Sequence, residues 1–194
     1  MQRQTAKEKI ITAAQQLMVG QGYTATTVDE IVASAGVAKG SFYHAFESKE
    51  ALALEALEDY FMRGMGIIGS GSYRKETDPV RRLYGFLDYV EEQAAGLWQH
   101  GCLLGSITLE LADNYPGLIA KVDELFLDME GRITGLFQPA LKARGIKTPD
   151  GKALARQMLV VIEGAIIMAK SHRDANLLKQ SLRHYRAYVE AILR

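Results

Sequence analysis

The chain holds one cysteine, Cys102, which follows His100 by two positions and could carry thiol chemistry. A cysteine reacts as its thiolate, so a sensing or catalytic role requires solvent access and a lowered thiol pKa. His100, or a basic residue such as Lys170 if the fold brings it near, could supply the positive potential. The alternative is that Cys102 is a small buried hydrophobic residue, the usual environment of a free cysteine. The sequence leaves both interpretations open.

Motifs that would indicate an enzyme are missing from the sequence. There is no glycine-rich phosphate loop, no His-Glu-x-x-His metal motif and no Gly-x-Ser-x-Gly nucleophile elbow. The remaining histidines, His44, His172 and His184, offer little catalytic pattern. We therefore expect no enzymatic activity, no metal and no cofactor. The alternative is an enzyme with a helical fold that uses the cysteine to act on small molecules.

Three short helices are predicted at the N-terminus. The first carries apolar residues at helical spacing over residues 10–18 and ends at the glycines that follow. Two threonines followed by two acidic residues then predict the start of a second helix, which Gly36 would end. The third helix covers residues 38–46, with Phe42 and Phe46 on its buried side. Two short helices joined by a tight glycine turn are typical of a helix-turn-helix, whose second helix enters the DNA major groove.

This segment resembles the signature of the tetracycline-repressor (TetR) family of transcriptional regulators. The resemblance is carried, in order and in spacing, by residues 27–31, TVDEI, and 36–52, GVAKGSFYHAFESKEAL. It implies an all-α protein with an N-terminal three-helix helix-turn-helix domain and a C-terminal helical domain for ligand sensing and dimerisation. The expected domains are residues 1–47 and 48–194.

The resemblance also implies which groups of the third helix contact DNA. Lys39, Ser41 and Tyr43 would touch phosphates or base edges. Gly40 would permit close approach, and His44 would reach the DNA backbone. Alternatively, Tyr43 could be a core aromatic residue with its hydroxyl at the edge of the core, and His44 could be an ordinary exposed residue.

Further DNA contacts are expected outside the third helix. Lys49 would add a phosphate contact, and Thr26 and Thr27 could present hydroxyl and N–H groups to a phosphate. The formal net charge is zero, because the chain contains 23 basic and 23 acidic residues. This neutrality argues against a general nucleoid-binding protein, which needs a broad basic surface. We therefore expect modest non-specific affinity and specificity from a few well-placed groups.

The remainder of the chain predicts longer helices that would form the sensing body. Ser48 would cap a fourth helix, residues 69–77 would form a flexible connection, and Pro139 would kink or end a later helix. A small, largely apolar ligand could bind among the middle helices, although aromatic and methionine residues at helical spacing are also typical of plain core. The candidate lining residues are Tyr84, Trp98, Phe126, Met129 and Met158.

Two strongly apolar helices are predicted to close the chain, beginning near residues 148–150 and near Asp174. Stripes that include Leu154, Val161 and Ala165 could either complete a monomer core or form a dimer interface. Because one recognition helix reads few base pairs, pairing on a palindromic operator favours a homodimer. The resemblance implies pairing here as a four-helix bundle. A ligand would change the distance between the two recognition helices and so weaken operator binding.

The segment around Cys102 resembles one branch of this family. Residues 101–105, GCLLG, fit a Gly-Cys-Leu-x-Gly pattern found in repressors that respond to reactive electrophiles or oxidants, among them the regulator of N-ethylmaleimide reductase. The resemblance implies that modification of Cys102 could release the protein from DNA.

The N-terminus lacks the apolar stretch of a secretory signal, and the best membrane candidate, at residues 158–169, is too short and contains Glu163. We therefore expect a cytoplasmic protein without a membrane partner. The expected partners are a double-stranded DNA operator, a second copy of the chain and a small-molecule inducer.

Overall fold

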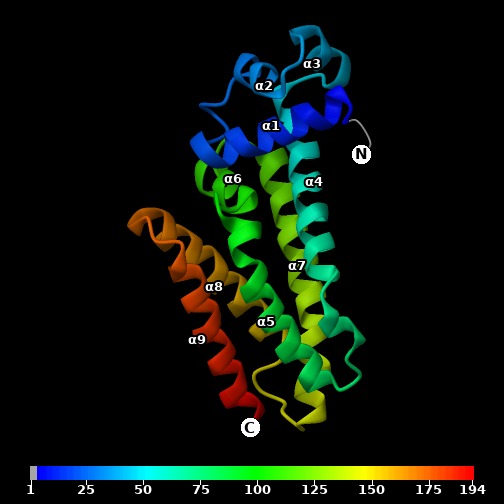
Figure 1. Cartoon of the computed structure of the whole chain (residues 1–194), viewed down its shortest axis with the longest axis vertical. Helices are drawn as coiled ribbons and strands as arrows, with labels where there is room; N and C mark the ends of the chain where they lie inside the picture. Colours follow the sequence, from blue (N-terminus) through cyan, green and yellow to red (C-terminus); the bar gives the residue numbers. More distant parts are fainter. Residues whose placement is uncertain (1–3) are drawn as a thin grey trace. The chain divides into compact units, whose positions relative to one another are not determined.

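The computed structural model describes residues 4–194, and within them the regular structure consists of helices, with no strand (Figure 1). The prediction of an all-α protein is confirmed. The chain packs as two compact units. Unit 1 comprises the described residues up to 63 together with 100–125, and unit 2 comprises 64–99 and 126–194. The predicted division after residue 47 falls inside unit 1, so that domain boundary stays a prediction.

Unit 1 contains α1 (Ala6–Gln21), α2 (Val28–Ala35), α3 (Lys39–Ala45), the first part of α4 (Lys49–Gly69), α6 (Leu103–Leu111) and the start of α7 (Pro116–Ala143). Its helices begin where the sequence supplies caps. A capping box starts α2, in which Thr27 and Glu30 each bond the other's backbone N–H. At the start of α4, Ser48 accepts a 3.0 Å hydrogen bond from the Ala51 N–H, as predicted.

Each helix of unit 1 buries apolar side chains, and α1 is in contact with α2, α3 and α6. Helix α1 therefore packs against both the helix-turn-helix and α6. The largest fully buried side chains of this unit are Ile10, Met18, Ile31, Phe42, Leu52, Leu57, Leu103, Leu104 and Ile107.

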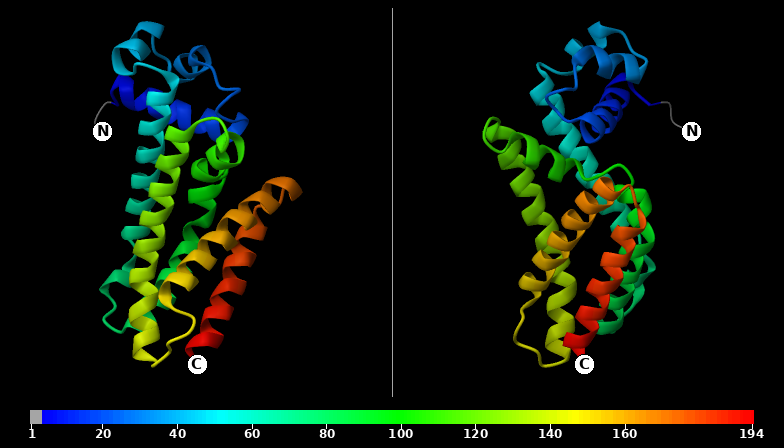
Figure 2. Two further views of the ribbon diagram at one scale, coloured as in Figure 1. Left: turned by 180° about the vertical axis from the view of Figure 1, so that it is seen from behind. Right: turned by 90° about the vertical axis from the view of Figure 1, so that its left-hand side faces the viewer.

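Unit 2 contains the end of α4, a short 3-10 helix η1 (Ser72–Lys75), α5 (Pro79–Trp98), the rest of α7, α8 (Gly151–His172) and α9 (Asn176–Leu193). Helices α8 and α9 lie side by side, and α5 packs on α9 (Figure 2). The Tyr185 hydroxyl donates a 2.6 Å hydrogen bond to the Leu154 carbonyl, which ties α9 to α8. Arg183 pairs with Glu91 at 2.6 Å, which ties α9 to α5.

Two local predictions differ from the structure. Helix α7 continues through Pro139 to Ala143, so the proline does not end the helix, while a kink there stays a prediction. The fully buried Phe137, Ala140 and Leu141 hold this stretch in the core despite the missing proline N–H. Residues 69–77, expected to be a flexible connection, include η1, which buries Tyr73. Within residues 4–194, no helix combines the length and the hydropathy that a membrane crossing requires.

Candidate functional site

The turn between α2 and α3 has the geometry of a helix-turn-helix. Gly36 ends α2 in the left-handed conformation (φ 62°, ψ 40°), which glycine adopts without a steric penalty. Its N–H donates to the Ala33 carbonyl at 3.2 Å, and the Val37 N–H donates to the Val32 carbonyl at 3.1 Å. These bonds close α2 and allow α3 to begin at Lys39.

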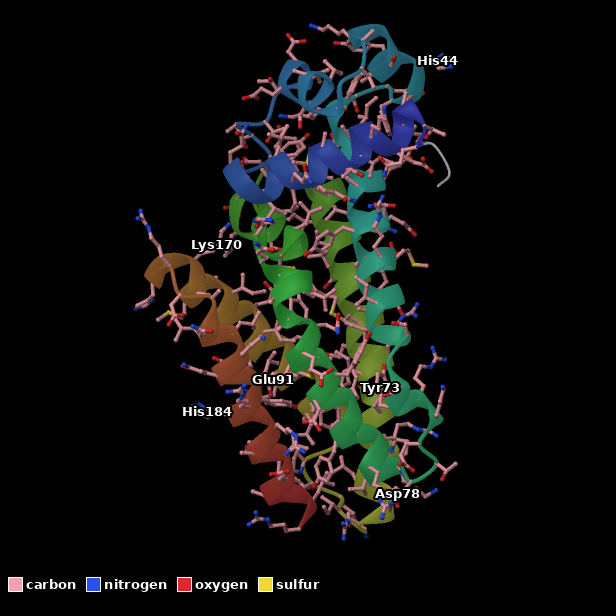
Figure 3. All side chains as sticks on the ribbon, viewed as in Figure 1. His44, Tyr73, Asp78, Glu91, Lys170 and His184 are labelled. Carbon is pink, nitrogen blue, oxygen red and sulfur yellow. The ribbon has the colours of Figure 1, made fainter. Side chains whose placement is uncertain are left out.

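One side of α3 is buried and the other is exposed. The fully buried Phe42 and the nearly buried Phe46 pack against each other with ring centroids 5.7 Å apart, as the spacing predicted. Tyr43 packs in a T-shaped arrangement with Phe42, with ring centroids 5.2 Å apart. It is 61% exposed, which rules out the alternative of a core aromatic. His44 is exposed as well, and Figure 3 shows its side chain at the surface. The remaining exposed or partly exposed positions expected at DNA are Lys39, Gly40 and Ser41.

Lys39 is exposed, but its charge already has a partner. The ammonium group lies 2.6 Å from the Asp29 carboxylate in the first turn of α2. The hydrogen bond and the charge of Asp29 raise the pKa of Lys39. A DNA phosphate would therefore compete with Asp29 for this lysine, and the carboxylate itself would repel the phosphate.

The two threonines expected at a phosphate both use their polar groups within the protein. Thr26 is fully buried, and its hydroxyl donates a 2.6 Å hydrogen bond to the Gly22 carbonyl, so this side chain does not face outward as expected. Thr27 donates from its N–H and its hydroxyl to the Glu30 carboxylate, each at 2.8 Å. The Glu30 carboxylate thus occupies the position at the N-terminus of α2 where a phosphate was expected.

Lys49 is also engaged inside unit 1. Its ammonium group donates to the carbonyls of Tyr23 at 3.0 Å and Thr26 at 2.9 Å, and lies 4.3 Å from the centre of the Tyr23 ring. Burial lowers the pKa of Lys49, and the nearby Glu110 charge opposes this change. The structure favours a role for Lys49 in fixing the loop between α1 and α2, and its phosphate contact stays a prediction.

Glu110, a residue without a role predicted from the sequence, holds the same loop from α6. Its carboxylate accepts hydrogen bonds from the N–H groups of Tyr23 and Thr24, both at 2.7 Å. Gly22 has a φ of 91°, and a Cβ there would lie 2.7 Å from a Glu110 oxygen, so the close approach requires glycine. These partners are 86 and 87 positions apart in the chain, and no local sequence pattern signals such a contact.

Cys102 is buried, with 5% of its surface exposed, and forms the N-cap of α6. In the preceding residue, the Gly101 carbonyl accepts a 3.2 Å hydrogen bond from the Tyr60 hydroxyl of α4. His100 is exposed, and the proximity of Lys170 to Cys102 stays a prediction. The burial of the thiol favours the buried interpretation of Cys102, and a sensing role would require the thiol to become accessible.

The predicted ligand-lining residues all belong to unit 2, but their environments differ. Phe126 and Met129 are partly exposed on α7, while Met158 is buried in α8. The Tyr84 ring lies 5.3 Å from the Arg186 guanidinium carbon. Trp98 lines a cavity of about 520 Å³ in unit 2, between α5, α8 and α9.

Two family descriptions match the chain. Residues 10–56 match the bacterial regulatory proteins of the tetR family. Residues 79–184, more than half of the chain, match the C-terminal domain of LmrA/YxaF-like transcriptional regulators. The first match covers the helix-turn-helix, and the second covers the helices from α5 into α9.

Individual relatives agree with these matches. The chain is 30% identical over 191 residues to the HTH-type transcriptional repressor DhaR of Mycobacterium sp. (strain GP1), covering 94% of this chain and 91% of that protein. It is 28% identical over 196 residues to the HTH-type transcriptional repressor NemR of Escherichia coli (strain K12), covering 92% and 90%. The crystal structure of a regulatory protein TetR from Rhodobacter sphaeroides superposes with a TM-score of 0.81 at 28% identity, covering 94% and 97%. These similarities lend no support to the enzyme alternative.

Proposed function

Since the chain belongs to the TetR family of ligand-responsive, DNA-binding transcriptional regulators, we propose that it is a repressor that binds a two-fold symmetric operator as a homodimer. Helix α3 of each copy would enter the major groove of one half-site. A small-molecule signal would then favour a conformation of the dimer that binds the operator less well.

The exposed side of α3 is the observation that carries this proposal. Phe42 anchors the helix in the core, which leaves Tyr43, Ser41 and His44 accessible to a partner. Gly40 lies in the first turn, and a Cβ at this position would meet no atom within 4 Å, so the surface is open there. A hydroxyl-rich, glycine-containing helix of this kind can approach base edges and phosphates closely.

In vitro selection of DNA from a random pool by the purified protein tests the proposal. We expect one palindromic consensus whose half-sites are spaced for a dimer. Tyr43→Ala should weaken binding to this consensus by about tenfold, on the scale of 1–3 kcal/mol for a good base or backbone contact. Leu109→Ala, a change at an exposed residue of α6, is the matched control and should bind as the wild type does. Recovery of no enriched sequence would contradict the proposal.

The outer side of α8 and α9 supports dimerisation. Leu154 and Ala165, expected at an interface, are instead buried within unit 2. The exposed side of α8 carries a second apolar stripe at helical spacing, formed by Val160, Val161, Gly164, Ile167 and Met168. On α9, Tyr188 is half exposed, and His184 lies on the outer surface of the helix (Figure 3).

A second copy would cover this stripe, and Gly164 would permit close approach of two helices. Ile167→Glu should therefore shift the protein from dimer to monomer in sedimentation equilibrium and weaken operator binding. Leu127→Glu, at an exposed apolar residue of α7, is the control and should remain dimeric. A dimeric Ile167→Glu variant would place the interface elsewhere.

Two signals are proposed for release from the operator. One is reversible binding of a small molecule in the helical body, for which the family membership is the support. The other is covalent modification of Cys102, for which the position of this residue at the start of α6 is the support, because α6 also carries Glu110. The two signals are separable by substitution of the cysteine alone.

A further inference from the structure

Unit 2 contains a second cavity, of about 430 Å³, which none of the predicted ligand-lining residues lines. It lies between the end of α4, η1, the start of α5 and the middle of α7. Its volume falls within the roughly 300–1,000 Å³ of small-molecule sites. Apolar side chains make up much of the wall, namely Met65, Ile68, Phe86, Ile133 and Leu136.

Tyr73 forms a fixed aromatic wall of this cavity. Its ring meets Phe86 edge-on with centroids 5.5 Å apart, and its hydroxyl donates a 2.8 Å hydrogen bond to the Ile68 carbonyl. A Cβ at Gly71 or Gly85 would lie 2.5 or 2.9 Å from Tyr73 side-chain atoms, so both glycines are needed for the ring to fit. Figure 3 shows Tyr73 beside α5. The cavity is therefore shaped by packing before any ligand enters.

The charged groups of the wall are arginines. The Arg74 guanidinium donates to the Gly69 carbonyl and the Arg82 guanidinium to the Glu76 carbonyl, both at 2.8 Å. Neither has a carboxylate within ion-pair distance in the described part of the chain. A third arginine, Arg132, differs because it pairs with the Asp128 carboxylate at 2.9 Å.

These two guanidiniums carry positive charge that no acidic side chain of the cavity wall offsets. A guanidinium has five N–H donors, so one backbone carbonyl leaves donors for a ligand. Arginine also suits planar or tetrahedral oxyanions, because it can form two parallel hydrogen bonds with them. Apolar walls with two such cations match a molecule with an anionic end and an apolar body.

We propose that this cavity binds a small amphipathic organic anion. Arg74 and Arg82 hold its carboxylate or sulfonate group, and its apolar or aromatic body lies against Tyr73, Phe86 and Ile133. This inference rests on the proposed function in one respect, since the anion would be the signal that the regulator senses. Met65, Ile68 and Gly69 belong to α4, the helix that begins at Lys49, so an occupant contacts the helix that continues into the helix-turn-helix unit.

Two fluorescent dyes that differ by one charged group test the proposal on the DNA-free full chain. The probe is 8-anilinonaphthalene-1-sulfonate, and its neutral partner is N-phenyl-1-naphthylamine, which lacks only the sulfonate. Arg74→Gln and Arg82→Gln should each weaken sulfonate binding about tenfold and leave the neutral dye unchanged, as expected for loss of a charge-assisted hydrogen bond. Arg81→Gln, an exposed arginine of α5 outside the cavity, is the matched control and should change neither.

Leu136→Trp should fill the cavity and weaken both dyes. Circular dichroism checks that each variant folds, and Arg74→Gln alone carries the test if Arg82→Gln does not fold. The proposal is overturned if the sulfonate does not bind the wild type, or if the two arginine variants bind it as Arg81→Gln does. An equal loss of both dyes in the arginine variants would overturn it too. Because no DNA is present, a failure here is independent of the outcome of the operator selection.

Discussion

The Glu110 carboxylate of α6 accepts a 2.7 Å hydrogen bond from the backbone N–H of Tyr23, in the loop that joins α1 to α2. Lys49 at the start of α4 donates to the carbonyl of the same Tyr23. The loop that precedes the helix-turn-helix is thus held by an acidic and a basic side chain from two other helices of unit 1. Because α6 begins directly after Cys102, a rearrangement at that residue would act on the helix that carries Glu110.

Removing the Glu110 charge should destabilise the protein in a pH-dependent way. Burial raises the pKa of Glu110, but hydrogen bonds from Thr24 and Tyr23 outweigh it and hold the pKa below its ordinary 4.5. A carboxyl whose pKa is lowered by folding stabilises the fold above its unfolded-state pKa, and this stabilisation is lost as the pH falls through the folded pKa. Glu110→Gln should therefore lower the free energy of unfolding at neutral pH by about 1 kcal/mol, a modest value because the site is partly in water.

Urea unfolding of the wild type and of Glu110→Gln at about pH 7 and about pH 3.5 checks this expectation. The difference between the two proteins should shrink at the lower pH, because the wild type progressively loses the stabilisation by the charged Glu110 as the pH falls toward its folded-state pKa. Glu92→Gln, at an exposed carboxylate of α5, is the control and should match the wild type at both pH values. A difference that stays constant with pH would mean that the charge of Glu110 is not what holds the loop.

The salt dependence of operator binding should separate the two lysines predicted to contact phosphate. Each lysine that neutralises a phosphate adds about 0.9 to the slope of log K against log salt concentration. Lys39→Gln should reduce the slope by about that amount, because Lys39 is exposed on α3. Lys49→Gln should leave the slope unchanged and lower thermal stability, because its ammonium group serves the carbonyls of Tyr23 and Thr26. An equal loss of slope in both variants would assign Lys49 to the DNA backbone.

The lysines also show how far the sequence could be interpreted. The periodicity of apolar residues predicted the buried Phe42 and Phe46 and the exposed side of α3, because helical spacing alone determines which residues share a side. The same local pattern placed Thr26 at a helix N-terminus but could not reveal that its hydroxyl turns inward to Gly22. Whether a side chain at a helix start faces solvent depends on the tertiary packing of the preceding loop.

Contacts between distant segments set the other limits of prediction. Glu110 acts on a loop far away in the sequence, and only the packing of α6 against α1 brings them together. Tyr73 lies in a stretch rich in glycine and serine that predicted a flexible connection. Its burial follows from space left by Gly71 and Gly85, which is a property of the assembled fold rather than of a local motif.

Neutralising Asp29 should strengthen operator binding. Asp29 pairs with Lys39 at 2.6 Å on the α2–α3 surface, where it both occupies this lysine and repels phosphate. Asp29→Asn should therefore raise affinity several-fold at low salt, with a smaller gain at high salt because exposed charges are screened. Asp123→Asn, an exposed acid of α7 in unit 1, is the control for overall charge and should change affinity little. Equal affinities of Asp29→Asn and the wild type would remove Lys39 from the proposed interface.

The reactivity of Cys102 distinguishes a sensing thiol from a buried core residue. With 5% of its surface exposed, the thiol should react slowly with N-ethylmaleimide in the folded protein and much faster in denaturant, as mass spectrometry can follow. A maleimide adduct does not fit a buried helix start, so its formation should displace α6 and loosen the Glu110 bonds to the Tyr23 loop. The modified wild type should then leave its operator, while Cys102→Ser binds the operator equally well before and after treatment. If the fully modified wild type stays bound, Cys102 is a core residue, and reversible ligand binding in the helical body is the signal that remains.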